Sequence, residues 1–313
     1  MSAEAQEILR AWRLPLWANL ALGITLIVYV RGWLALRKSP SELFSSRHLM
    51  AFLGGMFCLW IAIGSPLAAF DDVSLSVHMV QHLLLMAVVP PLVLLGVPVL
   101  PLLHGLPQWM VRRAAGRLLR WTPVQRLGRF LAHPVVCWIA ASVALLVWHI
   151  PSAFELALDS EFWHEVEHLC FLSTSILFWW PVIQPFPSQT VWPRWTIPLY
   201  VFFGMMPGGA LGAFLCFSDR VLYPAYVTRL NVFGISALSD QIFAGALMWV
   251  FGTLVYLLPV VIITVHLLAP QSQHPITVAD LELHPIGEST SDVTEPRSHS
   301  PRLQSVTYLK SAE

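Results

Sequence analysis

Five histidines have the chemistry and the spacing of a metal site. His78 and His82 are four residues apart, His164 and His168 are also four apart, and His149 lies between the two pairs in the sequence. Residues four apart share one face of a helix, so each pair can offer two imidazoles to one ion, and imidazole suits copper, zinc, iron or nickel. The alternative is that each histidine sits singly at a helix end and reaches lipid headgroups or a loop carbonyl. We favour a metal or haem site made from both pairs and His149.

The second pair also fits a catalytic motif. His164-Glu165-Val166-Glu167-His168 matches H-E-x-x-H, in which the two histidines bind zinc and Glu165 would activate water. His149 or Asp240 could supply a third ligand. The match fixes only three positions in an acidic stretch, and the sequence gives no sign of a groove that unwinds a substrate. An HExxH-type intramembrane zinc metalloprotease is therefore the least favoured function.

The composition indicates which elements must position these residues. The 313-residue chain is 56% hydrophobic and 12% charged, whereas soluble domains carry about 25% charged residues. Apolar runs of about 18 to 25 residues, long enough to cross a bilayer as helices, occur seven times. They are residues 16–36, 48–66, 78–103, 134–151, 165–183, 196–217 and 241–268. The sequence therefore predicts an all-α polytopic bundle of seven transmembrane helices over residues 16–268, preceded by an N-terminal segment, residues 1–15.

Two other regions differ from the apolar spans. Residues 105–131 alternate arginine with leucine and tryptophan, which predicts a basic helix on the surface of an anionic leaflet. Residues 269–313 are polar and rich in serine, proline and histidine. Their apolar surface is too small to offset the entropy of ordering, so they are predicted to form a disordered cytoplasmic tail.

The distribution of positive charge predicts the orientation of the bundle. With seven spans, fourteen of the lysines and arginines fall on the side of the C-terminus and four on the side of the N-terminus. Because cytoplasmic loops are enriched in lysine and arginine, the N-terminus is predicted outside and the C-terminus inside. The five histidines then share the outer face, which is also acidic. Asp240, which precedes the seventh span, could ligate a metal, orient a ligand histidine or cap a helix.

Methionines offer a softer type of ligand within the spans. Met205 and Met206 precede Pro207-Gly208-Gly209, which predicts a disturbed helix there, and Met79 and Met86 accompany the first histidine pair. Thioethers select Cu(I) over harder ions. Methionine beside a helix break is, however, more often a filler of irregular gaps, and we favour that interpretation.

Several motifs, taken in order along the chain, resemble one family. They are His78 to Leu85 continuing to Pro90-Pro91-Leu92 and Gly96-Val97-Pro98, Trp148-His149-Ile150-Pro151, Glu167-His168-Leu169, Phe178-Trp179-Trp180-Pro181, Gly212-Ala213, Asp219-Arg220, Leu222-Tyr223-Pro224, and Asp240-Gln241 with Gly245, Met248 and Trp249. The ordered set resembles the seven-helix CtaG family of cytochrome c oxidase assembly factors.

The resemblance implies a bacterial plasma-membrane protein that helps copper reach a haem-copper oxidase. Expected partners are oxidase subunits, the lipid bilayer and an extracytoplasmic copper chaperone, and no nucleic acid. We therefore predict a copper site formed by the five histidines with Asp240 in support. The alternative is a haem b electron-transfer protein, in which His82 and His168 would be axial ligands on opposite sides of one iron.

Overall fold

The computed structural model describes residue 6 and residues 15–37, 45–111, 121–184, 192–229 and 233–268, and every regular element within them is helical. The tail predicted over residues 269–313 lies outside the described residues, as do residues 112–120 of the predicted interfacial segment and most of residues 1–15. The helices belong to one compact unit.

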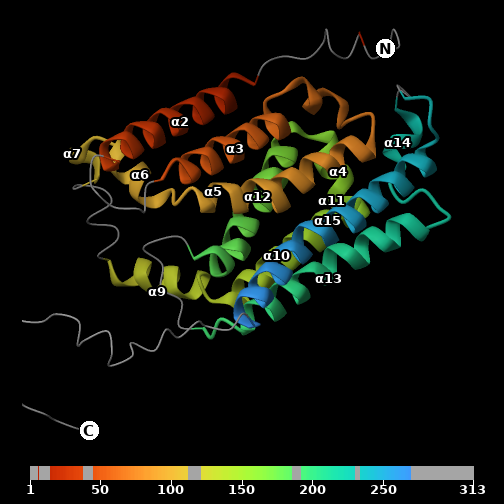
Figure 1. Ribbon diagram of the computed structural model, residues 1–313. Helices are drawn as coiled ribbons and strands as arrows, with labels where there is room; N and C mark the ends of the chain where they lie inside the picture. Colours follow the sequence, from red (N-terminus) through yellow and green to blue (C-terminus); the bar gives the residue numbers. More distant parts are fainter. Residues whose placement is uncertain are drawn as a thin grey trace, which may run out of the picture. The chain divides into compact units, whose positions relative to one another are not determined.

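Within the described residues, six helical segments are long and apolar enough to cross a membrane. They are α2 (Leu16–Leu36), α3 with the 3-10 turn η2 (Ser46–Phe70), α4 to α5 (Leu75–Leu95), α12 (Glu161–Ile183), α13 (Thr196–Phe217) and α15 (Ala237–Leu268). Figure 1 shows α2 lying beside α3, and α13 beside α15. The prediction of an all-α polytopic bundle is therefore confirmed.

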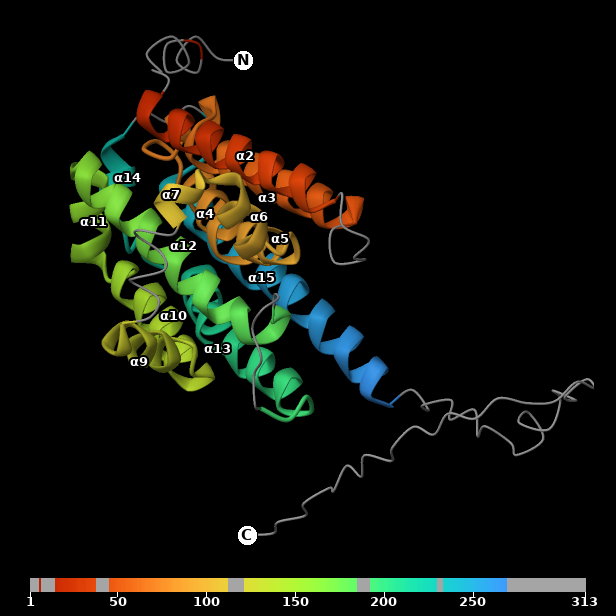
Figure 2. The same ribbon diagram turned by 90° about the vertical axis from the view of Figure 1, so that its left-hand side faces the viewer.

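The predicted fourth span is shorter than the others. Helix α10 (Pro134–Trp148) has 15 residues. The helix before it, α9 (Thr122–Leu131), meets α10 at a bend of 70°. Figure 2 shows α9 turned away from the direction of α10. The number of spans is seven if this bent pair is counted as one span and six if it is not. Helix α9 carries Arg126 and Arg129 beside exposed Leu127 and Phe130, which agrees with a helix at the membrane surface.

The predicted third span, residues 78–103, is wrong at its C-terminal end. The helix ends at Leu95, and the chain turns through Val97, whose φ of 47° interrupts the helix, before α6 (Val99–Gly105) begins. Tyr29 fixes this turn, because its hydroxyl donates a 2.7 Å hydrogen bond to the carbonyl of Gly96. Helix α6 then packs against α2.

A proline pair shapes the middle of the same span. Helix α4 (Leu75–Leu83) is followed by a π-helical turn, η3 (Leu84–Val88), and then by α5 (Val89–Leu95). Pro90 and Pro91 have no N–H groups, so the carbonyl of Met86 loses both the α-helical and the π-helical donor. The indole Nε1 of Trp179 donates to that carbonyl instead, at 3.1 Å. A tryptophan on α12 thereby ties α12 to the irregular turn.

The disturbance predicted at Pro207-Gly208-Gly209 does not interrupt the helix, because α13 continues from Thr196 to Phe217. Helices α13 and α15 approach closely through glycines. A Cβ placed on Gly245 would lie 2.6 Å from the backbone nitrogen of Cys216 and 2.7 Å from the carbonyl oxygen of Gly212. Small residues let transmembrane backbones touch in this way.

The close approach of α13 and α15 predicts different effects on stability when alanine replaces Gly245 or Gly252 of α15. Gly245→Ala should destabilise the protein by about 1–3 kcal/mol, because the new methyl group overlaps backbone atoms. Gly252→Ala is the matched control, because nothing lies within 4 Å of its added Cβ. Alanine there should be neutral or stabilising by up to about 1 kcal/mol. Thermal unfolding of the purified variants in detergent measures both, and equal melting temperatures would contradict the close approach.

Candidate metal centre

Three helices bring the predicted histidines to the same end of the bundle. His78 and His82 lie on α4, His164 and His168 lie near the start of α12, and His149 follows the last residue of α10. The ring centroids are 5.2 Å apart for His78 and His164, 5.6 Å for His82 and His168, and 5.8 Å for His82 and His149. The structure therefore places all five side chains in one group, which we call the histidine cluster.

A carboxylate completes the deepest part of the histidine cluster. The Oε1 of Glu167 lies 3.6 Å from Nε2 of His82, and its Oε2 lies 3.8 Å from Nε2 of His78. All three side chains are fully buried, and none of these atoms has a hydrogen-bond partner among the described residues. Ligands about 2.0–2.2 Å from one ion lie about 3–4 Å from each other. The three groups therefore have the separation expected around a single metal ion.

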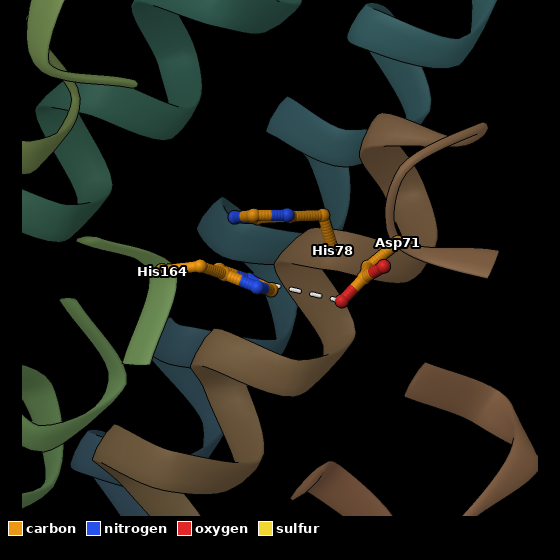
Figure 3. Close-up of side chains that lie close together, drawn as sticks. All are labelled: Asp71, His78 and His164. Carbon is orange, nitrogen blue, oxygen red and sulfur yellow. Dashed lines mark ion pairs between the residues drawn. The ribbon is translucent and has the colours of Figure 1, made fainter. Parts of the chain in front are cut away.

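A second group of ligands adjoins the first. Asp71 Oδ2 lies 3.7 Å from Nε2 of His164, and the ligand atoms of Asp71, His78 and His164 all lie within 4.8 Å of one another. Figure 3 shows Asp71 and His164 directed toward each other beside the ring of His78. Burial, followed by the charge of Asp72, raises the pKa of Asp71 to about 7. A cation in this group would favour the ionised carboxylate.

The orientation of His149 is fixed by its neighbours. Its Nδ1 lies 2.8 Å from the carbonyl oxygen of Leu145. A carbonyl only accepts, so Nδ1 carries the proton and the buried Nε2 keeps a free lone pair. The hydroxyl of Tyr223 also donates to the carbonyl of His149, at 3.0 Å. Burial lowers the pKa of His149 to about 4, so the ring is neutral and can accept a metal through Nε2.

An acidic cavity reaches the histidine cluster from one side. It has a volume of about 610 Å³ and lies among α2, α3, α11 (Pro151–Asp159) and α12, with His164 and His168 in its wall. Five acidic residues line it: Asp71, Asp72, Asp159, Glu161 and Glu165. Clefts lined by one sign of charge concentrate ions of the opposite sign. The cavity thus offers cations a route to the buried ligands.

Comparison with known proteins gives this arrangement a context. Residues 27–269 match the sequence model of the family described as cytochrome c oxidase caa3 assembly factor (Caa3_CtaG). The chain belongs to the CtaG family. Its ordered motifs and its helical bundle agree with that assignment.

Curated relatives of this CtaG family member occur in mycobacteria. Uncharacterised proteins of Mycobacterium bovis and Mycobacterium tuberculosis are each 27% identical over 282 residues, which cover 88% of this chain and 42% of the relative. A protein of Mycobacterium leprae is 26% identical over 266 residues, covering 82% of this chain and 40% of its own. The chain therefore spans less than half the length of these relatives. No solved structure matches it.

Asp240 of this CtaG protein lies outside both groups of ligands. Its carboxylate accepts hydrogen bonds from the hydroxyl of Ser74 at 3.2 Å and from the backbone nitrogens of Leu75 at 2.7 Å and Ser76 at 3.1 Å. These donors stand at the start of α4, where helical N–H groups have no partner within the helix. Of the roles considered for Asp240, the structure therefore places it as a cap, on α4 and not on its own helix. It positions His78 through the helix that carries it.

Glu167 and Asp71 were not among the residues selected from the sequence. Glu167 is fully buried and faces α4, whereas Glu165, two positions earlier, is exposed. The H-E-x-x-H match points to Glu165. An acidic residue of an apolar helix that faces the interior of the bundle, as Glu167 does, is the stronger functional signal. The exposure of Glu165 also disfavours its role as the water-activating glutamate of a zinc protease. Asp71 lies in a connection, where periodicity gives no orientation.

The capping role of Asp240 predicts a loss of stability that metal does not explain. Asp240→Ala should destabilise the metal-free protein by about 1–3 kcal/mol, because it leaves buried donors at the start of α4 without an acceptor. Asp219→Ala, an exposed aspartate in the connection before α15, should change stability by less than about 0.5 kcal/mol. Melting temperatures measured with a chelator present test this. Unchanged stability together with lost metal binding would instead make Asp240 a ligand.

Proposed function

We propose that this protein holds a copper ion in the histidine cluster and supplies it to a haem-copper cytochrome c oxidase during assembly. One observation carries the proposal: His78, His82 and Glu167 are fully buried, and their facing atoms, 3.6–3.8 Å apart, have no hydrogen-bond partner in the part of the chain that the structure describes. Buried polar groups are normally hydrogen-bonded, and an unpaired buried carboxylate is costly. A bound cation removes that cost. Membership of the CtaG family supports the role in oxidase assembly.

The chemistry of the ligands supports copper as the ion. Imidazole and carboxylate donors bind divalent first-row metals in an order that rises to copper. The predicted orientation puts the cluster and its acidic cavity at the outer face of a bacterial plasma membrane. Copper arriving from an extracytoplasmic chaperone would meet Glu161 and Glu165 before His164, since all three line the cavity and the two glutamates are exposed whereas His164 is half-buried. Asp72 and Asp159 are less available, because both are paired with Arg229. Oxidase subunits would then take the ion by ligand exchange.

The haem b alternative requires a porphyrin plane between two axial imidazoles. The ring of His82 packs 4.6 Å from Phe171, and the ring of His78 packs 5.0 Å from Phe154, measured between centroids. His82 and His168 are separated by 5.6 Å with their rings nearly perpendicular. This close packing of rings supports an ion over a macrocycle. The visible spectrum of the purified protein tests the choice.

Single substitutions in the cluster should remove copper. His82→Ala and Glu167→Gln should each lower copper affinity by at least about tenfold, since each takes away a ligand or its charge. His104→Ala is the control, because this exposed histidine on α6 bonds only to the carbonyl of Leu100 in its own helix. Copper per protein, measured by mass spectrometry of the purified variants, gives the result. In a strain that lacks the gene, oxidase activity should return with His104→Ala and not with His82→Ala.

Two results would contradict this proposal. A Soret band in the purified protein would favour haem b. Full copper content and full oxidase activity in both His82→Ala and Glu167→Gln would leave a scaffold that binds oxidase subunits without metal.

Copper removal should also lower stability. A ligand that binds only the folded state at a hundredfold excess over its Kd stabilises by about 2.7 kcal/mol. The wild-type protein should therefore unfold at a lower temperature after treatment with a chelator and recover when copper is returned. The chelator should lower the melting temperature of His82→Ala by less than that of the wild type. A chelator effect of equal size in the variant would place the stabilising ion elsewhere.

A further inference from the structure

A second cavity lies deeper in the bundle and is lined by methionine. It has a volume of about 60 Å³, and Met86 of η3, Met205 of α13 and Met248 of α15 all line it. We call it the thioether cavity. A water molecule needs about 10–15 Å³ measured in this way, so there is room for a small ion. None of its lining residues is a histidine or an acid.

The thioether cavity lies directly below the histidine cluster. Met86 is four residues beyond His82, and Ser175, also in its wall, is seven residues beyond His168. Leu145, a third lining residue, precedes His149 by four. These offsets continue the same helix faces by one or two turns, which is about 6 to 10 Å farther into the membrane. Three helices that carry cluster ligands therefore also build the cavity.

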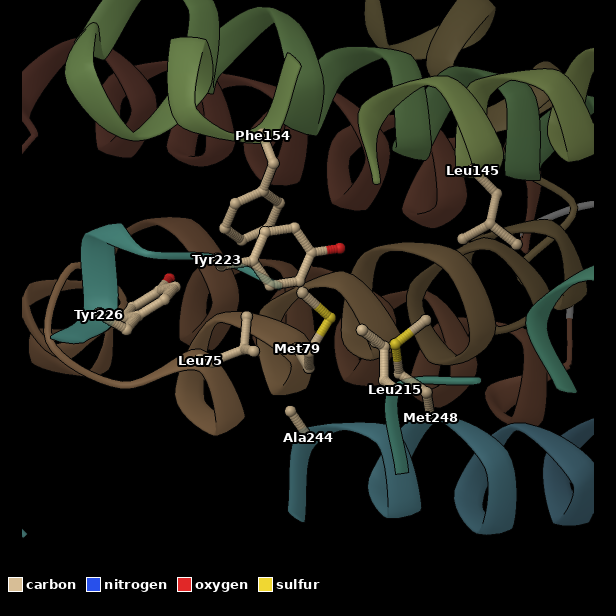
Figure 4. Close-up of a cluster of buried hydrophobic side chains, with 9 residues drawn as sticks. All are labelled: Leu75, Met79, Leu145, Phe154, Leu215, Tyr223, Tyr226, Ala244 and Met248. Carbon is tan, nitrogen blue, oxygen red and sulfur yellow. The ribbon is translucent and has the colours of Figure 1, made fainter. Parts of the chain in front are cut away.

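Packing accounts for only part of the methionine arrangement, in which Met248 belongs to a buried hydrophobic cluster and Met86 packs against it. Methionine commonly fills irregular gaps in a core, yet here three of the nine methionines surround a gap that remains open. Figure 4 shows Met248 of α15 and Leu145 of α10 pointing into the same interior from opposite sides. Met248 is almost completely buried, and the Trp179 bond to the Met86 carbonyl fixes the turn that carries Met86. The side chains are thus held around the space instead of closing it.

We propose that the thioether cavity is a binding site for monovalent copper, separate from the histidine cluster. Thioether sulfur selects Cu(I), whereas the oxygen and nitrogen ligands above accept divalent copper. The cost of burying an ion rises with the square of its charge, so a monovalent ion is the less costly one at this depth. Ser142, Ser175 and Tyr256 are the lining residues that carry hydroxyl groups. The site rests on the proposed copper function and extends it by a second, softer position.

The test uses Cu(I) added to the purified full chain under reducing conditions in detergent. In the double variant Met205→Leu/Met248→Leu, the sulfur scatterers in the copper X-ray absorption spectrum should disappear, and bound Cu(I) should fall by about one ion per protein. Leucine conserves the volume of methionine, so the core should tolerate it. Met206→Leu is the matched control, since Met206 is the next residue on α13, is 42% exposed and does not line the cavity. Its spectrum should equal that of the wild type.

Selenomethionine-labelled wild-type protein gives a measurement that needs no substitution. Its selenium absorption edge should report a copper neighbour when Cu(I) is present. The cavity site is overturned if copper shows only nitrogen and oxygen neighbours and the double variant binds as much Cu(I) as Met206→Leu. The proposed function fails separately, if His82→Ala keeps its nitrogen-bound copper while sulfur ligation remains.

Discussion

A carboxylate enclosed by two imidazoles, far from water, is the interaction on which the arrangement of this protein depends. Glu167 of α12 faces His78 and His82 of α4, and all three side chains are fully buried. In a medium of low dielectric constant an unpaired charge is expensive, and removing one member of such a group leaves the others uncompensated. The packing of α4 against α12 therefore encloses an acid and two imidazoles that make no hydrogen bond to one another. A cation shared among them would turn a destabilising contact into a stabilising one.

Distant segments hold this contact in place. Asp240 at the start of α15 caps α4, and the next residue, Gln241, accepts a 2.7 Å hydrogen bond from the backbone nitrogen of Leu222 and donates a 2.9 Å bond to the carbonyl of Arg220. Arg220 and Leu222 lie in the connection between α13 and α15. This connection also carries Tyr223, whose hydroxyl donates a hydrogen bond to the backbone carbonyl of His149. One short stretch of α15 therefore helps to set the position of both α4 and the end of α10. The cluster is a property of the whole bundle and not of the helices that bear its histidines.

The sequence was sufficient for the parts of the site that depend on periodicity. The spacing of His78 and His82, repeated in His164 and His168, together with alternating span directions, predicted that these side chains would meet. It was insufficient where orientation depends on packing. Glu165 and Glu167 are two residues apart and so lie on nearly opposite sides of α12, and only the neighbouring α4 decides which one is buried.

Positions fixed by contacts between remote segments were also beyond the sequence. Asp240 accepts hydrogen bonds from residues more than 160 positions earlier in the chain. No local sequence pattern predicts such a bond. The early end of the third span at Leu95 has a similar origin, because a hydrogen bond from Tyr29 of α2 holds the turn at Gly96. Pro98 follows this turn in the sequence, but the form of the turn depends on the partner helix.

His78 is a member of both ligand groups, with Glu167 and His82 on one side and Asp71 and His164 on the other. Two cations in these adjoining positions would compete for one imidazole and repel each other across a few ångströms of low dielectric. Occupation of the two positions would therefore be anticooperative. An ion that moved from Asp71 and His164 to His82 and Glu167 could exchange these ligands while it stayed bound to His78. It would then pass inward without a step in which it has no protein ligand.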